Sequence, residues 1–176
     1  MRQTIQLSTP TPDYPETIDG LDLPEHAFLL AVRCWVVARQ KDADPQRRSR
    51  TILDIVGAAD AASPLDQFMT IAARSTSRRV VTYCPCAPHV GEDEKHLLHA
   101  ASLVQNGQRG LAVRVLWATM LTMDGTMLAI GPLEDVGARF GKSGLLFRLR
   151  ETPPAKPAFP STVEGWLSSL SSSTLH

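Results

Sequence analysis

The stretch PEHAFLLAVRCWVVARQK, residues 24–41, decides the fold that the sequence predicts. Wound as a helix, it presents apolar side chains on almost every side, and Arg33 is the single charged residue between positions 27 and 38. The preceding Asp22-Leu23-Pro24 is typical of a helix start, because proline is tolerated in the first turn. A helix that is apolar all round must be covered by other elements, so we expect it to lie at the centre of a bundle.

Further segments carry apolar residues at helical spacing behind recognisable start signals. The sequence therefore predicts a mainly α protein, a compact bundle of about five to seven helices with at most one or two short strands. The other helices are expected at 44–59, from Ser63-Pro64 onward, and at 91–105, 111–123 and 127–140, the last open to a break at Gly131-Pro132. Residues 79–83 are expected to form a brief strand, and residues 145–149 a short strand or a last extended segment.

Proline content divides the chain into three parts. Residues 1–22 hold three prolines and little periodicity, and we expect an extended N-terminal arm. Residues 23–150 would form the helical domain, and residues 151–176 a proline-rich linker followed by an amphipathic mini-helix. The mini-helix has apolar residues at the i, i+3, i+4 and i+7 positions: Val163, Trp166, Leu167 and Leu170. We expect this stripe to dock on its own domain or in the groove of a partner.

The charge balance and the hydrophobic pattern restrict the partners. Lysine and arginine together number 18, as do aspartate and glutamate, so the chain has no general attraction to nucleic acid or to an anionic membrane. The arginine clusters at 47–50 and 74–79 are interpreted as solvated helix ends. Zero net charge leaves little repulsion between copies, which favours a protein partner or a homo-oligomer. The sequence shows no secretory signal and no apolar run of the ~20 residues that a bilayer span takes, which predicts a cytoplasmic protein.

One short stretch, YCPCAPHVGEDEKHLLH at residues 83–99, gathers residue types that bind metals. It holds two of the three cysteines and three of the five histidines. In a reducing compartment a close pair of cysteines indicates metal or redox chemistry more often than a structural disulfide, and a disulfide here would close a strained ring. The proline between Cys84 and Cys86 favours a turn that brings both sulfurs together, and His96 and His99 share one flank of the helix that follows.

This pattern predicts a structural zinc site, because zinc takes four thiolate and imidazole ligands in a tetrahedron. The expected ligands are Cys84, Cys86, His96 and His99, with His89 or Glu92 as substitutes. The Cys-x-Cys spacing departs from that of zinc fingers, whose cysteines are about two to four residues apart. A loop with two thiols, followed by a helix with two solvated histidines, is the simpler alternative.

The predicted function rests on this cluster. We expect a small cytoplasmic helical protein with one zinc ion that acts as a protein-interaction or regulatory module. The first alternative is a metal- or thiol-dependent enzyme, with Cys86 as the nucleophile and His89 or His96 as the base. The second is a metal-free helical protein or a nucleic-acid-binding module. The sequence identifies no oxyanion hole and no third catalytic member, so it assigns no catalytic residue and leans against an enzyme.

Overall fold

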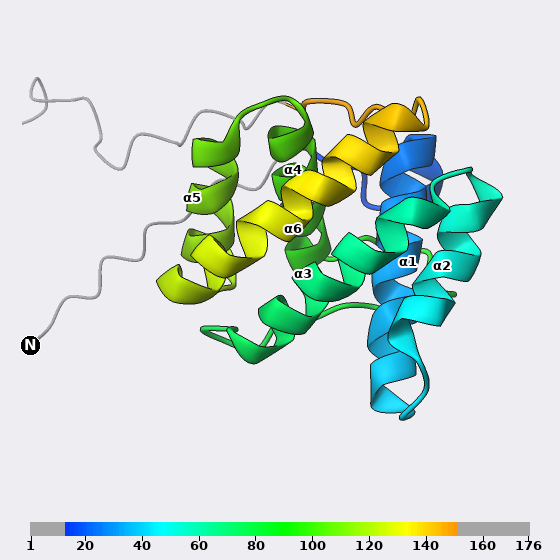
Figure 1. Cartoon of the computed structure of the whole chain (residues 1–176), viewed down its shortest axis with the longest axis horizontal. Helices are drawn as coiled ribbons and strands as arrows, with labels where there is room; N and C mark the ends of the chain where they lie inside the picture. Colours follow the sequence, from blue (N-terminus) through cyan, green and yellow to red (C-terminus); the bar gives the residue numbers. More distant parts are fainter. Residues whose placement is uncertain (1–12, 151–176) are drawn as a thin grey trace, which may run out of the picture.

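The computed structural model describes residues 13–150 of the 176-residue chain. Six α-helices and two single-turn 3-10 helices, but no strand, occur within this range (Figure 1). The predicted mainly α fold is therefore confirmed. The helices are α1 (Leu23–Gln40), α2 (Pro45–Ile55), α3 (Ala62–Arg74), α4 (Glu92–Gln105), α5 (Arg109–Thr119) and α6 (Met123–Lys142), with the 3-10 turns η1 (Ile18–Gly20) and η2 (Ala59–Ala61).

The helix predicted from the apolar stretch at residues 24–41 forms as α1. The side chain of Glu25 accepts a hydrogen bond from the backbone N–H of Asp22 at 2.9 Å, and Pro24 lies in the first turn, where it breaks no helical hydrogen bond. α1 packs against α2 and also contacts α3 and α4. Its core-facing side chains, among them Phe28, Val32 and Trp35, are buried, so the predicted central position is confirmed.

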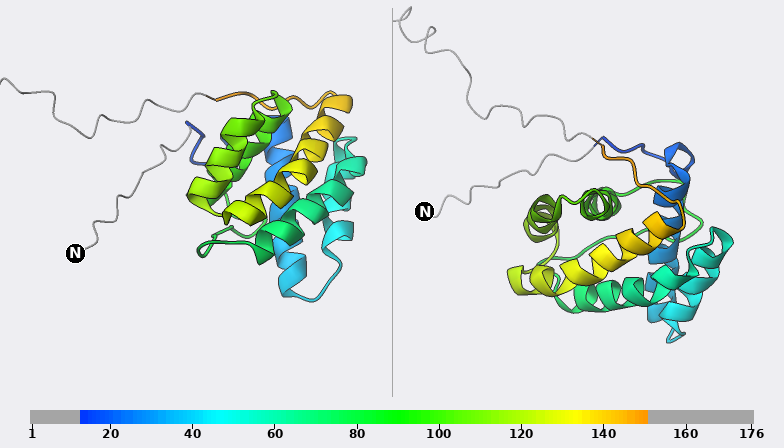
Figure 2. Two further views of the ribbon diagram at one scale, coloured as in Figure 1. Left: turned by 60° about the vertical axis from the view of Figure 1, so that its left-hand side comes forward. Right: turned by 45° about the horizontal axis from the view of Figure 1, so that its top comes forward.

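The remaining helices form two pairs beside α1. α3 and α6 lie side by side, and α4 and α5 form a second pair, both helices of which contact α6 (Figure 2). α4 is as deeply enclosed as α1, because every residue from Asp93 to Val104 is buried. The fold therefore encloses two helices, and each carries charged residues into the interior.

Three aromatic rings join α1 to α6 and to the segment that follows α6. Phe28 of α1 lies 6.3 Å from Phe140 of α6 and 5.8 Å from Phe147, measured between ring centroids. Phe140 and Phe147 stack at 5.2 Å. Burial of three phenylalanine side chains in one cluster contributes several kcal/mol, at about 1.5–3 kcal/mol for each. The extended segment after α6 is thereby fixed to α1.

The two ends of the described chain meet beside the first turn of α1 (Figure 2). Arg150 donates two hydrogen bonds to the Glu25 carboxylate, at 2.9 and 2.7 Å. The Arg150 guanidinium carbon also lies 4.8 Å from the ring centroid of Tyr14, which is 4% exposed. Residues 13–22 are thus packed against the helices, while residues 1–12 lie outside the described range.

Neither of the two expected strands forms among residues 13–150. Residues 79–83 are extended, but the N–H groups of Val81 and Tyr83 bind side-chain carboxylates of α4 instead of a neighbouring strand. Residues 145–150 run as an extended segment, which was the alternative expected for them. The residue types in these segments favour a strand, but within residues 13–150 no neighbouring strand is present to pair with them.

The helix boundaries differ from the predicted ones around residue 120. A single helix was expected at 111–123, but α5 ends at Thr119 and α6 begins at Met123. The Thr122 side chain accepts a hydrogen bond from the N–H of Gly125 at 3.2 Å and so caps α6. Gly125 also permits close packing on the end of α3, because a Cβ there would lie 2.1 Å from Cβ of Ser75.

Pro132 does not divide α6, although the sequence allowed a break there. A proline within a helix leaves the carbonyl four residues earlier without its usual donor. That carbonyl belongs to Leu128, which is 66% exposed, so water can satisfy it. Trp117 of α5 is 52% exposed, although it lies in a segment rich in apolar residues.

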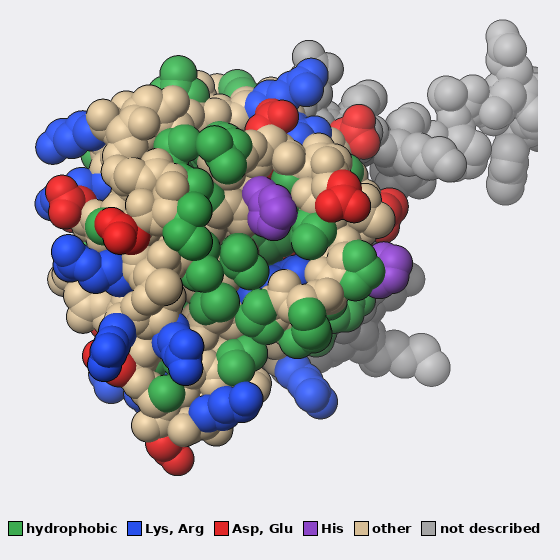
Figure 3. Space-filling model, turned by 90° about the vertical axis from the view of Figure 1, so that its right-hand side faces the viewer, with side chains coloured by type: hydrophobic (Ala, Val, Ile, Leu, Met, Phe, Trp, Pro, Cys, Tyr) green, Lys and Arg blue, Asp and Glu red, His purple; other side chains and the backbone are tan. Residues whose placement is uncertain are grey.

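Charged groups of both signs surround a hydrophobic band on the face that carries α1 and α2 (Figure 3). The exposed arginines of α2 are Arg47, Arg48 and Arg50. In the other arginine cluster, Arg78 is bound to Asp93 rather than left for a ligand.

None of the helices in residues 13–150 has both the length and the hydrophobicity that a membrane span requires. The mini-helix predicted around Trp166 lies outside the described residues.

Candidate functional site

The loop of residues 75–91 joins α3 to α4 and carries both cysteines of the predicted metal cluster. It contains no helix or strand of its own. A backbone hydrogen bond of 3.0 Å from Ala87 N–H to the Cys84 carbonyl forms a turn around Pro85 and Cys86. A loop without regular structure must find partners for its backbone groups elsewhere, and here two helices supply them.

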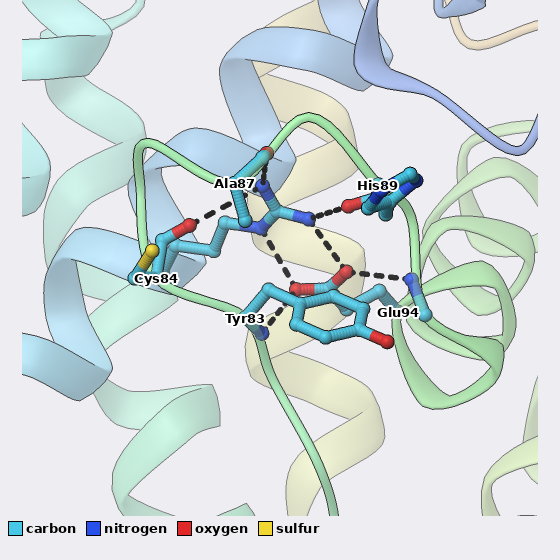
Figure 4. A network of polar contacts seen from close by, with 7 residues as sticks. Tyr83, Cys84, Ala87, His89 and Glu94 are labelled. Carbon is cyan, nitrogen blue, oxygen red and sulfur yellow. Dashed lines mark hydrogen bonds and ion pairs between the residues drawn. The ribbon is translucent and has the colours of Figure 1, made fainter.

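Arg33 of α1 holds the inner side of this loop (Figure 4). Its side chain is 1% exposed. The guanidinium donates to the Ala87 carbonyl at 2.8 Å and to the His89 carbonyl at 2.5 Å, with a longer contact of 3.5 Å to the Cys84 carbonyl. Three carbonyls of one loop therefore converge on one buried cation.

Glu94 of α4 completes this arrangement from the opposite side. Its carboxylate, 0% exposed, accepts two hydrogen bonds from Arg33, at 2.8 and 2.7 Å. It also accepts the N–H of Tyr83 at 3.0 Å and the N–H of Gly91 at 2.8 Å. A guanidinium has five N–H donors and a carboxylate about four acceptor positions, and all of them are used here. The buried pair is therefore fully satisfied.

A second carboxylate in the first turn of α4 anchors the loop closer to α3. Asp93, also buried, is bound by the Arg78 guanidinium and accepts the N–H of Val81 at 2.7 Å. Burial alone would raise the pKa of Asp93, but the hydrogen bonds from Arg78 and Val81 outweigh it and hold the pKa below its ordinary value. The acidic first turn of α4 thus binds three backbone amides of the loop, those of Val81, Tyr83 and Gly91.

Residues 16–18 hold the outer side of the same loop. The Ile18 N–H donates to the Pro88 carbonyl at 2.8 Å, and the Val90 N–H donates to the Glu16 carbonyl at 2.9 Å. These bonds form an isolated antiparallel bridge between Thr17 and His89. Arg33 on the inner side and residues 16–18 on the outer side therefore fix the loop at residues 87–90, immediately after the two cysteines.

The two thiols lie at the exposed tip of this fixed loop. The sulfur atoms of Cys84 and Cys86 are 3.0 Å apart and form a hydrogen bond in which either can donate. The hydrogen bond from Cys86 holds the pKa of the Cys84 thiol below its ordinary value, and nearby backbone N–H groups and Arg33 act in the same direction. The same hydrogen bond and the Cys84 charge raise the pKa of Cys86. The arrangement favours one thiolate shared by two sulfurs.

The histidines of α4 are placed differently from the expected metal ligands. His96 and His99 are 7% and 5% exposed, so they are not solvated. His99 meets the ring of Tyr14 edge-on, with 6.5 Å between the centroids. Burial lowers the pKa of His96, and burial together with the charge of His96 lowers that of His99 to about 4.

The structure brings together the predicted cysteines but not the four-ligand set. Among residues 13–150, no group of three or more His, Cys, Asp or Glu side chains is arranged to hold a metal ion. Of the substitute ligands, Glu92 binds Lys95 at 2.9 Å, and the side chain of His89 is exposed while its backbone carbonyl binds Arg33. The predicted turn at Cys84–Cys86 is present, and the imidazoles of His96 and His99 are buried.

Arg33 and Glu94 are the central residues that sequence reasoning missed. The signals were present, since Arg33 interrupts an otherwise apolar run and Glu94 stands three residues after the helix-capping position Gly91. The partners are 61 residues apart in the chain, so no local pattern connects them. Gly91 also allows the close approach of Tyr83, whose ring atom Cε2 would lie 3.1 Å from an added Cβ.

The buried histidines give the chain a stability that depends on pH. The folded chain keeps His99 neutral down to about pH 4, whereas the unfolded chain takes up a proton near the ordinary value of 6.5. Stability is therefore complete above the unfolded value and is lost as the pH falls from 6.5 toward 4, because the unfolded chain then binds more protons. We expect the free energy of unfolding in urea to fall by about 1–2 kcal/mol between about pH 7 and pH 5.

Two substitutions test whether His99 causes the pH dependence of the unfolding free energy. His99→Gln is expected to reduce the decline in unfolding free energy, whereas His89→Gln is the matched control, because His89 is exposed and holds the loop only through its backbone. A decline of the same size in His99→Gln and in the unsubstituted chain would contradict the assignment.

No protein family, no curated protein and no solved structure matches this chain.

Proposed function

We propose that this chain is a thiol-based regulatory module whose working group is the Cys84–Cys86 pair, cycling between a dithiol and a disulfide. The observation that carries the proposal is the distance of 3.0 Å between two exposed sulfurs on a loop that is fixed on both sides. Bond formation requires only a short further approach of the two sulfurs. A disulfide in so small a ring is strained, and strained, exposed disulfides are the readily reduced, regulatory ones.

The proposed oxidant is a low-molecular-weight disulfide. The Cys84 thiolate attacks one sulfur of this compound, forms a mixed disulfide and releases one small thiol. The Cys86 thiol, after losing its proton, then attacks the Cys84 sulfur and releases the second small thiol. Two electrons and two protons pass from the protein to the small disulfide, which leaves as two thiols. Excess small dithiol reverses the sequence.

The regulatory role is supported by a cavity that the same loop helps to line. Residues 76–82 of the loop make one wall of an open cavity of about 380 Å³, which also contacts Trp35 of α1 and Met69 of α3. We call it the α1–α3 cavity. Closing a disulfide at the tip changes the backbone around Cys84, whose carbonyl faces Arg33. A change of redox state is thereby transmitted along one loop to the wall of the cavity.

We expect the full chain, equilibrated in mixtures of oxidised and reduced glutathione, to form the Cys84–Cys86 disulfide reversibly. The midpoint should lie above about −300 mV, because a strained, exposed disulfide is easier to reduce than a structural one. Thiol alkylation followed by peptide mass analysis measures the oxidised fraction. Cys34 of α1, which is only half-buried, is the internal control and should stay alkylatable after unfolding.

A variant distinguishes the paired reaction from general thiol reactivity. Cys86→Ser can form only a mixed disulfide at Cys84, so one glutathione should stay attached to the oxidised protein. The proposal is refuted if the unsubstituted chain also stops at the mixed disulfide, or if Cys34 is the residue that pairs.

A second candidate function uses the same sulfurs as metal ligands, in line with the predicted zinc site. Its support is the convergence of two thiols on one exposed point. Thiolates are the ligands that zinc and other soft metals select. Zinc held there would take two protein ligands from the pair, and the buried imidazoles of α4 would not take part.

Zinc analysis of the purified full chain separates this form from the four-ligand site predicted from the sequence. If the pair holds zinc, Cys84→Ser should lose the bound ion and His96→Ala should retain it. A four-ligand site would lose zinc in both variants. Retention in Cys84→Ser, or no zinc in the unsubstituted chain, rules out the thiol pair as a zinc site.

A further inference from the structure

The α1–α3 cavity has an apolar interior. Its walls include Trp35 of α1 and Met69 of α3, and Leu97, Met120 and Leu121 close its inner end. The Trp35 ring nitrogen is bound to Asp66 at 2.7 Å, so the face of the indole is fixed. A concave apolar surface of this size is suited to one or two large hydrophobic side chains.

Positive charge marks the rim of the cavity. Arg39 at the end of α1 and Arg79 of the loop are both exposed and both line it. An occupant with an apolar stripe and an acidic residue at its border would therefore fit the interior and the rim together.

A segment of the same chain has this composition. Within residues 163–170, Val163, Trp166, Leu167 and Leu170 share one helical face, and Glu164 is the only charged residue. Tryptophan is the side chain that most often anchors such contacts. The segment lies outside the described residues, so the argument rests on its sequence and on its tether.

The tether is long enough to reach the cavity. Arg150 is held by Glu25 near the start of α1, and 12 residues (162 − 150) separate it from Val163. Four of them are prolines, and an extended proline-rich chain of this length spans about 37 Å at ~3.1 Å per residue. Trp35 and Gln40 lie only 10 and 15 residues beyond Glu25 on the same helix, about 15 and 22 Å at ~1.5 Å per residue.

We propose that residues 163–170 dock in the α1–α3 cavity of their own chain, with Trp166 in the interior and Glu164 at the arginine rim. A short tether gives an effective concentration in the millimolar range. A segment with an intrinsic Kd of about 0.1 mM is then docked about nine-tenths of the time. The cavity is thus a self-occupied docking site, and a protein partner with a similar stripe has to displace the segment.

Hydrogen exchange of the full chain tests this occupancy. Trp166→Ala should raise the exchange rates of α3 residues 69–73 and of loop residues 78–82 by about tenfold, the factor expected for losing a ninety-percent docked segment. Ala73→Glu, at an exposed residue that lines the cavity, should give the same increase from the other side of the contact. Trp117→Ala is the matched control, because Trp117 lies exposed on α5 and should leave these rates unchanged.

Dilution identifies the source of the segment. Protection that stays constant over a hundredfold dilution, with a monomeric mass by light scattering, supports docking within one chain. Protection that falls on dilution would instead place the segment of a second copy in the cavity. Unchanged exchange in Trp166→Ala and in Leu167→Ser would refute the proposal. All exchange measurements are made on the reduced protein, so this test does not require the disulfide to form, and it and the test of the proposed function fail separately.

Discussion

The buried pair of Arg33 and Glu94 is the interaction on which the rest of the structure depends. Two ions taken out of water cost several kcal/mol each, and their attraction repays this only when every donor and acceptor is satisfied. Here α1 supplies the cation, α4 supplies the anion, and the loop between α3 and α4 supplies the remaining partners. Because each component completes the others, the two enclosed helices and the loop are fixed as one unit.

This constraint explains how two exposed thiols are held close together. A loop tip without regular structure would ordinarily sample many conformations, and two flexible cysteines would seldom meet. The carbonyls of Ala87 and His89 are fixed by Arg33, and the amides of Tyr83 and Gly91 are fixed by Glu94. The anchors on either side restrict the short segment between them, in which the sulfurs of Cys84 and Cys86 lie 3.0 Å apart. The ion pair is thus a structural element, and it places two reactive thiols next to each other.

Features that depend on neighbouring residues in the sequence could be predicted, whereas features that depend on contacts between distant residues could not. The start of α1 at Asp22-Leu23-Pro24 and the turn at Cys84–Cys86 follow from capping and proline chemistry, which act over a few residues. The burial of His96 and His99 could not be predicted from their helix alone, since it depends on which neighbours cover that flank. Trp117 shows the converse, because an apolar helix can leave a large ring exposed. The zinc hypothesis depends on how the flank of α4 lies relative to the two thiols, which is a tertiary property that spacing does not encode.

The most direct test of the central claim is hydrogen exchange of the loop amides in the unsubstituted chain and in Arg33→Lys. Lysine keeps the charge but lacks the planar fork that reaches the carboxylate and the carbonyls together. We predict strong protection of the Tyr83 and Gly91 amides in the unsubstituted chain. In Arg33→Lys these amides should exchange at least tenfold faster while the core of α6 keeps its protection, and Arg47→Met on the exposed side of α2 should change neither. Equal protection of the loop amides with and without Arg33 would contradict the account.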